Sequence, residues 1–353
     1  MSGKIPLEKF LVGSCQASNS NTKALDLSEN RNNLHHIFEQ QDLYALWAAF
    51  SAKRPLLIRG EPGTGKSQAA KAIAQRLGWG FVKETINGTT ELSDLHWHFD
   101  AIGRLAEAQV MGSGGSSKEK GDDPLNPLNF LAPGAFWWAY NWKTASGQFA
   151  RCKTQIRSKP ENFGDGEEPK GVVLLLDEID KAQPDLANGL LETLGDRSFN
   201  VPFLSSNNNN SDINPVKAAE DANVLVVITT NEERELPSAF LRRCFVHTLN
   251  MGPVFDESEN YTESDKTSAK CNWLIERGKL HFGSSIKDDV YKKAAELVWA
   301  DREAQTLYKP GLAEYIDLLK ALSEVKSESD EEAKEQLAML EAISSYALKK
   351  EMS

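Results

Sequence analysis

The sequence predicts an α/β fold, in which a parallel sheet flanked by helices is followed by a small all-helical domain. A glycine-rich turn at residues 60–67 joins a short apolar segment to a helical pattern, and parallel α/β units begin in this way. Two continuous apolar runs, at 172–176 and 224–229, are typical of strands buried on both faces of a sheet. Beyond Pro253 the apolar residues recur every three or four positions, which indicates helices.

The first elements follow in chain order. An amphipathic pattern has Asp42 near its start, where a carboxylate interacts favourably with the helix dipole. The segment after the glycine turn is rich in alanine and straight-chain residues, which favour helix, and Gly78 ends it. The expected helices of this part are 42–50, 67–77 and 186–194, and its expected strands are 56–58, 172–176 and 224–229.

Composition shifts along the chain set the expected domains. We expect a polar, Ser/Asn-rich leader at 1–30, an α/β nucleotide-binding domain at 31–255 and a helical domain at 256–353. Residues 112–123 and 205–211 are flexible or polar loops by composition. The expected helices of the last domain are 290–302, 312–322 and 331–348.

Composition and charge exclude several classes of protein. The chain has 353 residues, of which 40% are hydrophobic and 26% charged, so it is neither a disordered chain nor a fibre. Its net charge of −11 argues against a generic binder of nucleic acid or of an anionic membrane. No apolar run approaches the roughly 18 residues of a membrane span. Four widely spaced cysteines without a CxxC pair fit a reducing cytoplasm best.

The glycine-rich turn matches the phosphate-binding pattern GxxxxGK[ST]. Backbone N–H groups of such a P-loop surround phosphates, and the dipole of the following helix adds to their attraction. Lys66 would reach the β- and γ-phosphates, and the Ser67 hydroxyl would bind Mg²⁺. The alternative is a turn that merely joins strand to helix. The predicted nucleotide-binding residues are Gly60, Glu61, Pro62, Gly63, Thr64, Gly65, Lys66 and Ser67.

A second acidic motif ends the strand expected at 172–176. Asp177 would then lie at the carboxyl end of a parallel strand, where it can hold a Mg²⁺ ion. Glu178, the next residue, is suited to polarise an attacking water. The alternative is a strand that ends in acidic surface residues. The distance in sequence from Lys66 to Asp177 exceeds one helical crossover, so an insertion lies between them.

Three further residues follow the strand expected at 224–229. The Asn231 amide could orient a water molecule. Arg242 and Arg243 come after a short helix, and one of them is a candidate arginine finger that acts on the nucleotide of a neighbouring subunit. Taken alone, the two arginines are more typical of a surface pair.

These motifs, in this order and with a helical region behind them, resemble the AAA+ ATPases. The resemblance is closer to the MoxR-like group, which borders the dynein-related and chelatase-type proteins. It covers about residues 34–322. The resemblance implies that 60–67 is Walker A, that Asp177 and Glu178 are the Walker B residues, that Asn231 is sensor 1, and that Arg243 is the finger. The stretches that carry it are RPLLIRGEPGTGKS (54–67), TELSDLHWHFDAIGRLAEA (90–108) and TNEERELPSAFLRRC (230–244).

The resemblance also explains the insertion. It implies inserts near 91–140 and 199–215 that face a central pore or a substrate, although Trp137 and Trp138 could simply belong to the core. One departure concerns the helical domain. Ala313 stands where related proteins often carry a sensor-2 arginine, so either Arg302 or Lys309 replaces that contact or the contact is missing.

The resemblance implies an ATP-hydrolysing, Mg²⁺-dependent remodelling or chaperone-type enzyme that acts on a protein partner as a ring, with a hexamer as the expected size. A protein with a von Willebrand factor A domain is the implied partner. Two alternatives stay open: a nucleotide-dependent assembly switch in a signalling or defence complex, and a nucleic-acid motor, against which the acidic balance argues. His96 and His98 lack further ligands nearby for a metal site, and the cysteines lack a local base.

Overall fold

The computed structural model describes residues 22–23, 36–113, 123–154, 157–204, 214–255, 260–304, 309–325 and 332–348. Contacts between residues divide the chain into two compact units. The first contains Tyr44–Ile58 and Ile73–His247, and the second contains Arg59–Ala72, Thr248–Ser353 and the described part of 12–43. The segment with the glycine-rich turn therefore groups by its contacts with the helical region. Most of the leader expected at 1–30 lies outside the described residues; Thr22–Lys23 form β1, which pairs with β2 (Phe38–Glu39).

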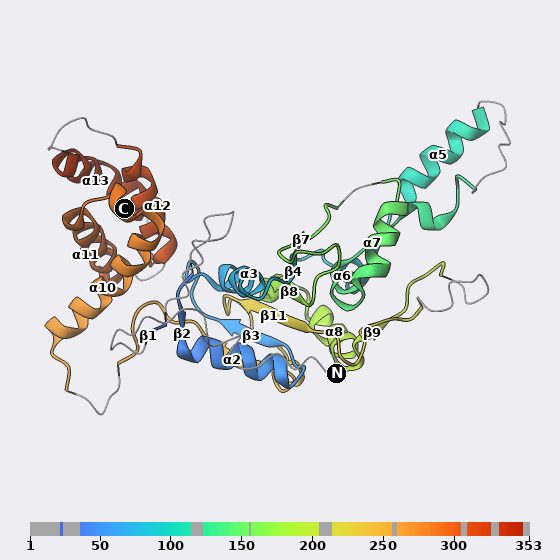
Figure 1. Cartoon of the computed structure of the whole chain (residues 1–353), viewed down its shortest axis with the longest axis horizontal. Helices are drawn as coiled ribbons and strands as arrows, with labels where there is room; N and C mark the ends of the chain where they lie inside the picture. Colours follow the sequence, from blue (N-terminus) through green and yellow to red (C-terminus); the bar gives the residue numbers. More distant parts are fainter. Residues whose placement is uncertain are drawn as a thin grey trace. The chain divides into compact units, whose positions relative to one another are not determined.

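A six-stranded sheet is the centre of the first unit, with strand order β12-β3-β11-β8-β4-β7 (Figure 1). β8 runs parallel to both β11 and β4, as the apolar runs predict, and each of its six residues is buried. The edge strand β7 pairs antiparallel to β4. The strands are β3 (Leu56–Arg59), β4 (Gly80–Thr85), β7 (Glu161–Asn162), β8 (Val172–Asp177), β11 (Val224–Thr230) and β12 (Phe245–Thr248).

The helices expected beside the sheet form close to their predicted bounds. Helix α2 spans Gln40–Ser51, α3 spans Lys66–Leu77 and α8 spans Pro184–Asp196. Pro184 occupies the first turn of α8, where its missing N–H costs no hydrogen bond. A four-residue helix, α9 (Ser238–Leu241), precedes β12.

The stretch between β4 and β8 folds into its own helices and a small hairpin. Its elements are α4 (Leu92–His96), β5 (Trp97–Phe99), α5 (Ala101–Ser113), β6 (Leu131–Pro133), α6 (Ala135–Tyr140) and α7 (Trp142–Arg151). Helix α5 projects away from the sheet of its unit (Figure 1). The side chains of Phe136, Trp137 and Trp138 are buried in the core, so these aromatic residues form no contact surface. A second hairpin pairs β9 (Ser198–Phe199) with β10 (Val216–Lys217) at the two ends of the insert expected near 199–215, of which residues 205–213 lie outside the described residues.

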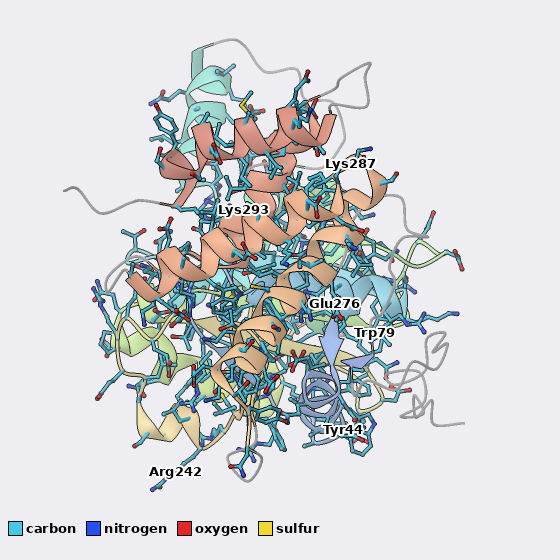
Figure 2. The ribbon with its side chains drawn as sticks, turned by 90° about the vertical axis from the view of Figure 1, so that its left-hand side faces the viewer. Tyr44, Trp79, Arg242, Glu276, Lys287 and Lys293 are labelled. Atoms are coloured by element: carbon cyan, nitrogen blue, oxygen red, sulfur yellow. The ribbon has the colours of Figure 1, made fainter. Side chains whose placement is uncertain are left out.

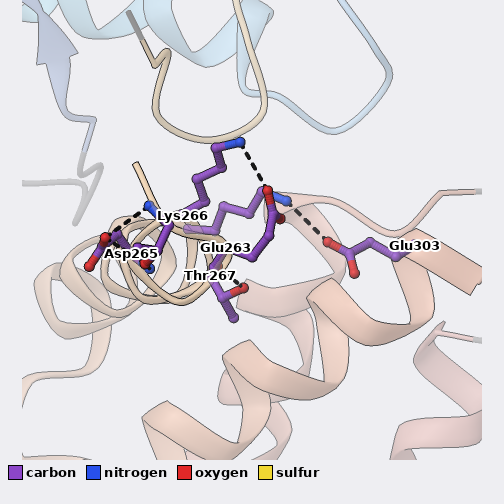
Figure 3. A network of polar contacts seen from close by, with 7 residues as sticks. Glu263, Asp265, Lys266, Thr267 and Glu303 are labelled. Atoms are coloured by element: carbon purple, nitrogen blue, oxygen red, sulfur yellow. Dashed lines mark hydrogen bonds and ion pairs between the residues drawn. The ribbon is translucent and has the colours of Figure 1, made fainter. Parts of the chain in front are cut away.

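Four helices make up most of the second unit. They are α10 (Glu263–Phe282), α11 (Asp288–Ala304), α12 (Leu312–Ser323) and α13 (Glu332–Leu348), and they bury a core that includes Leu274, Val298 and Leu319. Helix α10 begins with a capping box, in which Thr262 and Asp265 satisfy each other's backbone N–H groups. Figure 3 shows Asp265 at this start and Glu303 of α11. Glu303 forms an ion pair with Lys270 of α10, with an Nζ–Oε1 distance of 3.1 Å. No helix among the described residues has the length and apolar character needed to cross a membrane.

Candidate nucleotide site

The phosphate loop, residues 60–67, connects β3 to α3. Gly60 has a φ of 149°, and a Cβ atom there would lie 2.4 Å from the backbone oxygen of Leu249. Gly63 and Gly65 have φ values of 78° and 89°, in the region that side-chain-bearing residues rarely adopt. These three glycines are therefore required by backbone conformation, and at Gly60 also by the close approach of a neighbouring carbonyl.

Lys66 lies folded back on the phosphate loop. Its ammonium group donates hydrogen bonds to the carbonyl oxygens of Gly60 at 2.7 Å and Glu61 at 2.8 Å, and only 7% of the residue is exposed. The Thr64 hydroxyl donates to the same Glu61 carbonyl at 3.0 Å. The loop therefore has a closed, internally bonded conformation with a positive charge at its centre, which suits a polyphosphate anion.

The carboxyl end of β8 carries Asp177 and Glu178. The Thr229 hydroxyl, on the neighbouring strand β11, donates a hydrogen bond of 2.6 Å to Asp177 Oδ1 and accepts one of 2.9 Å from the Glu178 N–H. Glu178 itself has left-handed backbone angles, φ 61° and ψ 49°. Residues held in this sparsely populated region cluster at functional sites, because the surrounding structure must impose the conformation. Thr229 thus fixes the positions of both acidic residues.

A second buried acid holds the segment after β11. Asp180 is 2% exposed, and its two carboxylate oxygens accept hydrogen bonds from the backbone N–H groups of Asn231 at 3.3 Å and Glu233 at 3.2 Å. The Asn231 side chain is half-buried. The turn from β8 therefore positions Asn231 through Asp180.

Asp177 forms an ion pair with a lysine side chain in this structure. The Lys83 ammonium lies 2.8 Å from Asp177 Oδ2, and the Asp177 side chain is 10% exposed. A shielded carboxylate with a hydroxyl and an ammonium as its neighbours is a donor of the hard oxygen type that Mg²⁺ prefers. The residues therefore fit a magnesium ion held by one protein carboxylate together with substrate phosphates. Among the described residues, no three His, Cys, Asp or Glu side chains gather into a metal-binding group.

Arg242 and Arg243 follow α9, and both side chains are exposed; Figure 2 shows Arg242 pointing away from the ribbon. Their backbone is held by Arg54, whose Nε donates to the Arg243 carbonyl at 3.0 Å and whose Nη2 donates to the Arg242 carbonyl. The Arg54 guanidinium also lies over the Phe245 ring, 5.4 Å from its centroid. The two exposed arginines therefore stand on a fixed backbone.

Arg302 of α11 contacts the phosphate loop within the second unit. Its guanidinium pairs with the Glu61 carboxylate and donates to the Pro310 carbonyl at 3.2 Å, and its side chain is 13% exposed. Lys309 is exposed. Ala313 lies beside the loop as well, because its N–H donates to the Gly63 carbonyl at 3.3 Å. Of the two residues considered for the sensor-2 contact, Arg302 is the one that reaches the phosphate loop.

Comparison with known proteins identifies the family. The family model for the ATPase family associated with various cellular activities (AAA) matches residues 56–252, more than half of the chain. The chain belongs to the AAA ATPase family. A search of curated proteins finds no match for this AAA ATPase. Among solved structures, a candidate ATPase from Cytophaga hutchinsonii is 14% identical, with 83% of this chain and 76% of that chain covered and a TM-score of 0.31; at these values the likeness supports no argument.

The motifs of this AAA ATPase belong to both compact units. Asp177, Glu178 and Asn231 lie at the carboxyl ends of the neighbouring strands β8 and β11 of the first unit, and residues 60–67 form the phosphate loop of the second unit. Sequence reasoning missed Thr229, Asp180, Arg54 and Lys83, which support these residues. The repeated acid in DEID (177–180) was the only local signal for any of them.

Other titratable side chains of the AAA ATPase have structural partners. His96 bonds to the Thr193 hydroxyl at 2.8 Å and stacks on Phe199 at a centroid distance of 4.2 Å, and burial lowers its pKa to about 4. Burial raises the pKa of the Cys244 thiol to about 12, so this cysteine is no nucleophile at neutral pH. Cys152 and Cys271 are buried free thiols, and Cys15 lies outside the described residues.

Proposed function

We propose that this AAA ATPase binds ATP with its phosphate loop and hydrolyses it with the acidic residues at the end of β8. The observation that carries the proposal is the Asp177–Thr229–Glu178 group, which holds one carboxylate beside a cation and a second carboxylate in an imposed backbone conformation. Lys66 would neutralise the β- and γ-phosphates. ATP, rather than GTP, is the expected nucleotide because of the family.

The proposed roles divide the chemistry among the residues of this chain. Ser67 and Asp177 would hold Mg²⁺, which when bound neutralises charge on the phosphate oxygens. Glu178 would accept a proton from the attacking water, and the Asn231 amide would orient that water. Arg243, with Arg242 as the alternative, would stabilise the transition state in a neighbouring subunit.

We further propose that the protein is MoxR-like and works as a ring, with a hexamer as the expected size, that remodels a protein partner in the cytoplasm. Helix α5 supports a protein partner, because it exposes several large apolar side chains on the insert: Ile102 (82%), Leu105 (60%), Val110 (68%) and Met111 (45%). Apolar groups gathered on one exposed element are typical of protein contact surfaces. A protein with a von Willebrand factor A domain is the partner we would test first.

A nucleotide-dependent assembly switch is the second candidate function. It is favoured by Ala313, which has no charged group to offer where related proteins carry an arginine, so closure on nucleotide would depend on Arg302 alone. Slow hydrolysis with tight nucleotide binding would support this candidate. Fast, concentration-dependent hydrolysis would support the remodelling ring.

Two variants test the proposed site, with binding measured by calorimetry and turnover by phosphate release. Lys66→Ala is expected to weaken ATP binding at least a hundredfold, because the loop loses its central charge. Glu178→Gln is expected to bind ATP as tightly as the wild type and to hydrolyse it at least a hundredfold more slowly. Unchanged ATP affinity in Lys66→Ala would reject the phosphate-loop assignment.

A further inference from the structure

Lys83 stands next to the magnesium carboxylate proposed above. It belongs to β4, which runs parallel to β8, and its Cα pairs in register with that of Leu175. Leu175 and Asp177 lie on the same face of β8, since side chains alternate along a strand. Lys83 therefore projects from the same face and leans along the strand to place its ammonium 2.8 Å from Asp177 Oδ2.

The two partners of this ion pair differ in their access to water. The Asp177 side chain is 10% exposed, whereas that of Lys83 is 45% exposed. A shielded carboxylate is costly to leave without a positive neighbour. A half-exposed lysine, by contrast, has a flexible four-carbon stem and can move its ammonium into water at little cost. Breaking the ion pair therefore costs the Asp177 carboxylate more free energy than it costs the Lys83 ammonium.

We propose that Lys83 is the counter-ion of Asp177 in the nucleotide-free protein and that it competes with the divalent cation for this carboxylate. The carboxylate cannot interact at full strength with an ammonium and a hydrated divalent cation at once, because the two cations repel each other. Lys83 then sets the Mg²⁺ concentration at which the protein holds ATP tightly. This inference rests on the proposed function.

Binding equilibria test the competition without measuring turnover. The protein carries Glu178→Gln to prevent hydrolysis, and the Kd of a fluorescent mant-ATP probe is measured in EDTA and at several Mg²⁺ concentrations. The ratio of the Kd in EDTA to the Kd at saturating Mg²⁺ reports the coupling between cation and nucleotide. In Lys83→Met this ratio is expected to rise about tenfold above that of the unsubstituted Lys83 protein, and half-saturation is expected at lower Mg²⁺. Lys83→Gln, a second neutral variant, is expected to behave in the same way if Lys83→Met folds poorly.

Lys153→Met is the matched control, because the Lys153 side chain is 46% exposed, like that of Lys83, and pairs with Glu107 at 3.7 Å on the segment between β4 and β8 of the same unit. The ratio of the Kd in EDTA to the Kd at saturating Mg²⁺ is expected to be the same in this control as in the Glu178→Gln protein that retains Lys83. An unchanged ratio in both neutral Lys83 variants would show that the ion pair is only structural, and a lowered ratio would show that Lys83 assists metal binding; either result overturns the inference while nucleotide binding stands. If the Lys83 protein binds no probe at any Mg²⁺ concentration, the proposed function itself fails, and the inference with it.

Discussion

The Thr229 hydroxyl is a buried partner shared by Asp177 and the Glu178 backbone. Thr229→Val keeps the shape of the side chain and removes both hydrogen bonds. We expect ATP turnover to fall at least tenfold, and the free energy of unfolding to fall by about 1–3 kcal/mol because a buried carboxylate loses its donor. Turnover assays and urea unfolding measure the two effects.

Thr229→Ser is the matched control for this prediction, because it retains the hydroxyl and loses one methyl group. Serine should recover most of the turnover that valine loses. If valine and serine reduce turnover equally, packing of the methyl group matters and the hydrogen bonds do not.

At the residue scale, motifs predicted the groups that we propose to bind the nucleotide, but not the groups that support them. Lys66, Asp177 and Glu178 belong to short local patterns whose spacing follows from the chemistry of phosphate binding. Thr229 lies 52 residues from Asp177, and Arg54 lies 189 residues from Arg243. Such partners are brought together only by strand order, which a single sequence does not specify.

The phosphate loop gives a prediction at the scale of an element. Gly60→Ala places a methyl group against the Leu249 carbonyl, in a backbone conformation that alanine avoids. We expect the free energy of unfolding to fall by about 1–3 kcal/mol and ATP affinity to fall at least tenfold. Thermal unfolding and calorimetry measure these effects.

Gly147→Ala is the control for this prediction, because Gly147 lies inside α7 with open space around the position of a Cβ atom. Alanine there should stabilise the protein by about 0.5–1 kcal/mol through its higher helix propensity. Equal effects of the two substitutions would mean that the loop conformation is not required.

Helix α4 gives a prediction about pH. Burial lowers the pKa of His96 from 6.5 to about 4, so the folded protein holds fewer protons than the unfolded chain between these values. The stability gained from neutral His96 is complete above pH 6.5 and is lost as the pH falls toward 4. Between pH 7 and pH 5, the wild type should lose about 1–2 kcal/mol more than His96→Gln. Urea unfolding at both pH values checks this; equal losses would contradict it. His36, whose pKa burial also lowers to about 4, is present in both proteins and cancels.

Apolar patterning predicted the elements that are buried along their length. The runs at 172–176 and 224–229 became β8 and β11, and the helices α3, α11 and α12 formed near their expected bounds. Helix α10 was not delimited, because its first half is mostly polar or charged and shows no clear apolar repeat, although its capping box at 262–265 is a local signal. Strand β4 was missed because six mixed residues show neither alternation nor a continuous apolar run.

For the whole molecule, the exposed arginines after α9 predict assembly-dependent activity. Arg243→Ala should keep ATP binding and lose at least a hundredfold in turnover, because the proposed finger would serve the nucleotide of a neighbouring subunit. Wild-type turnover per subunit should rise with protein concentration as light scattering shows a ring forming. The ATP turnover of a mixture of wild type and Arg243→Ala should differ from the sum of the turnovers of the two proteins assayed separately. A rate equal to their simple sum would contradict action between subunits, and a larger loss in Arg242→Ala would assign the finger to Arg242.

At the scale of the whole molecule, the compact units do not follow the order of the chain, whereas the domains expected at 31–255 and 256–353 are each one continuous segment. The compact units are discontinuous, since Arg59–Ala72 groups with Thr248–Ser353. Pairs such as Arg302 with Glu61 and Ala313 with Gly63 contribute to this grouping. Composition along the chain can locate a change from strands to helices, but it does not reveal contacts between segments as far apart in sequence as Glu61 and Arg302.

The bonds from Arg54 to the carbonyls of residues 242 and 243 have a consequence for genetics. Loss of the Arg54 side chain would release the backbone on which the candidate finger stands, while leaving the finger's own charge in place. A screen for defective alleles should therefore recover changes at codon 54 that phenocopy those at codon 243. Because Arg54 precedes the first strand of the sheet, such alleles would map almost 200 codons away from the function they impair.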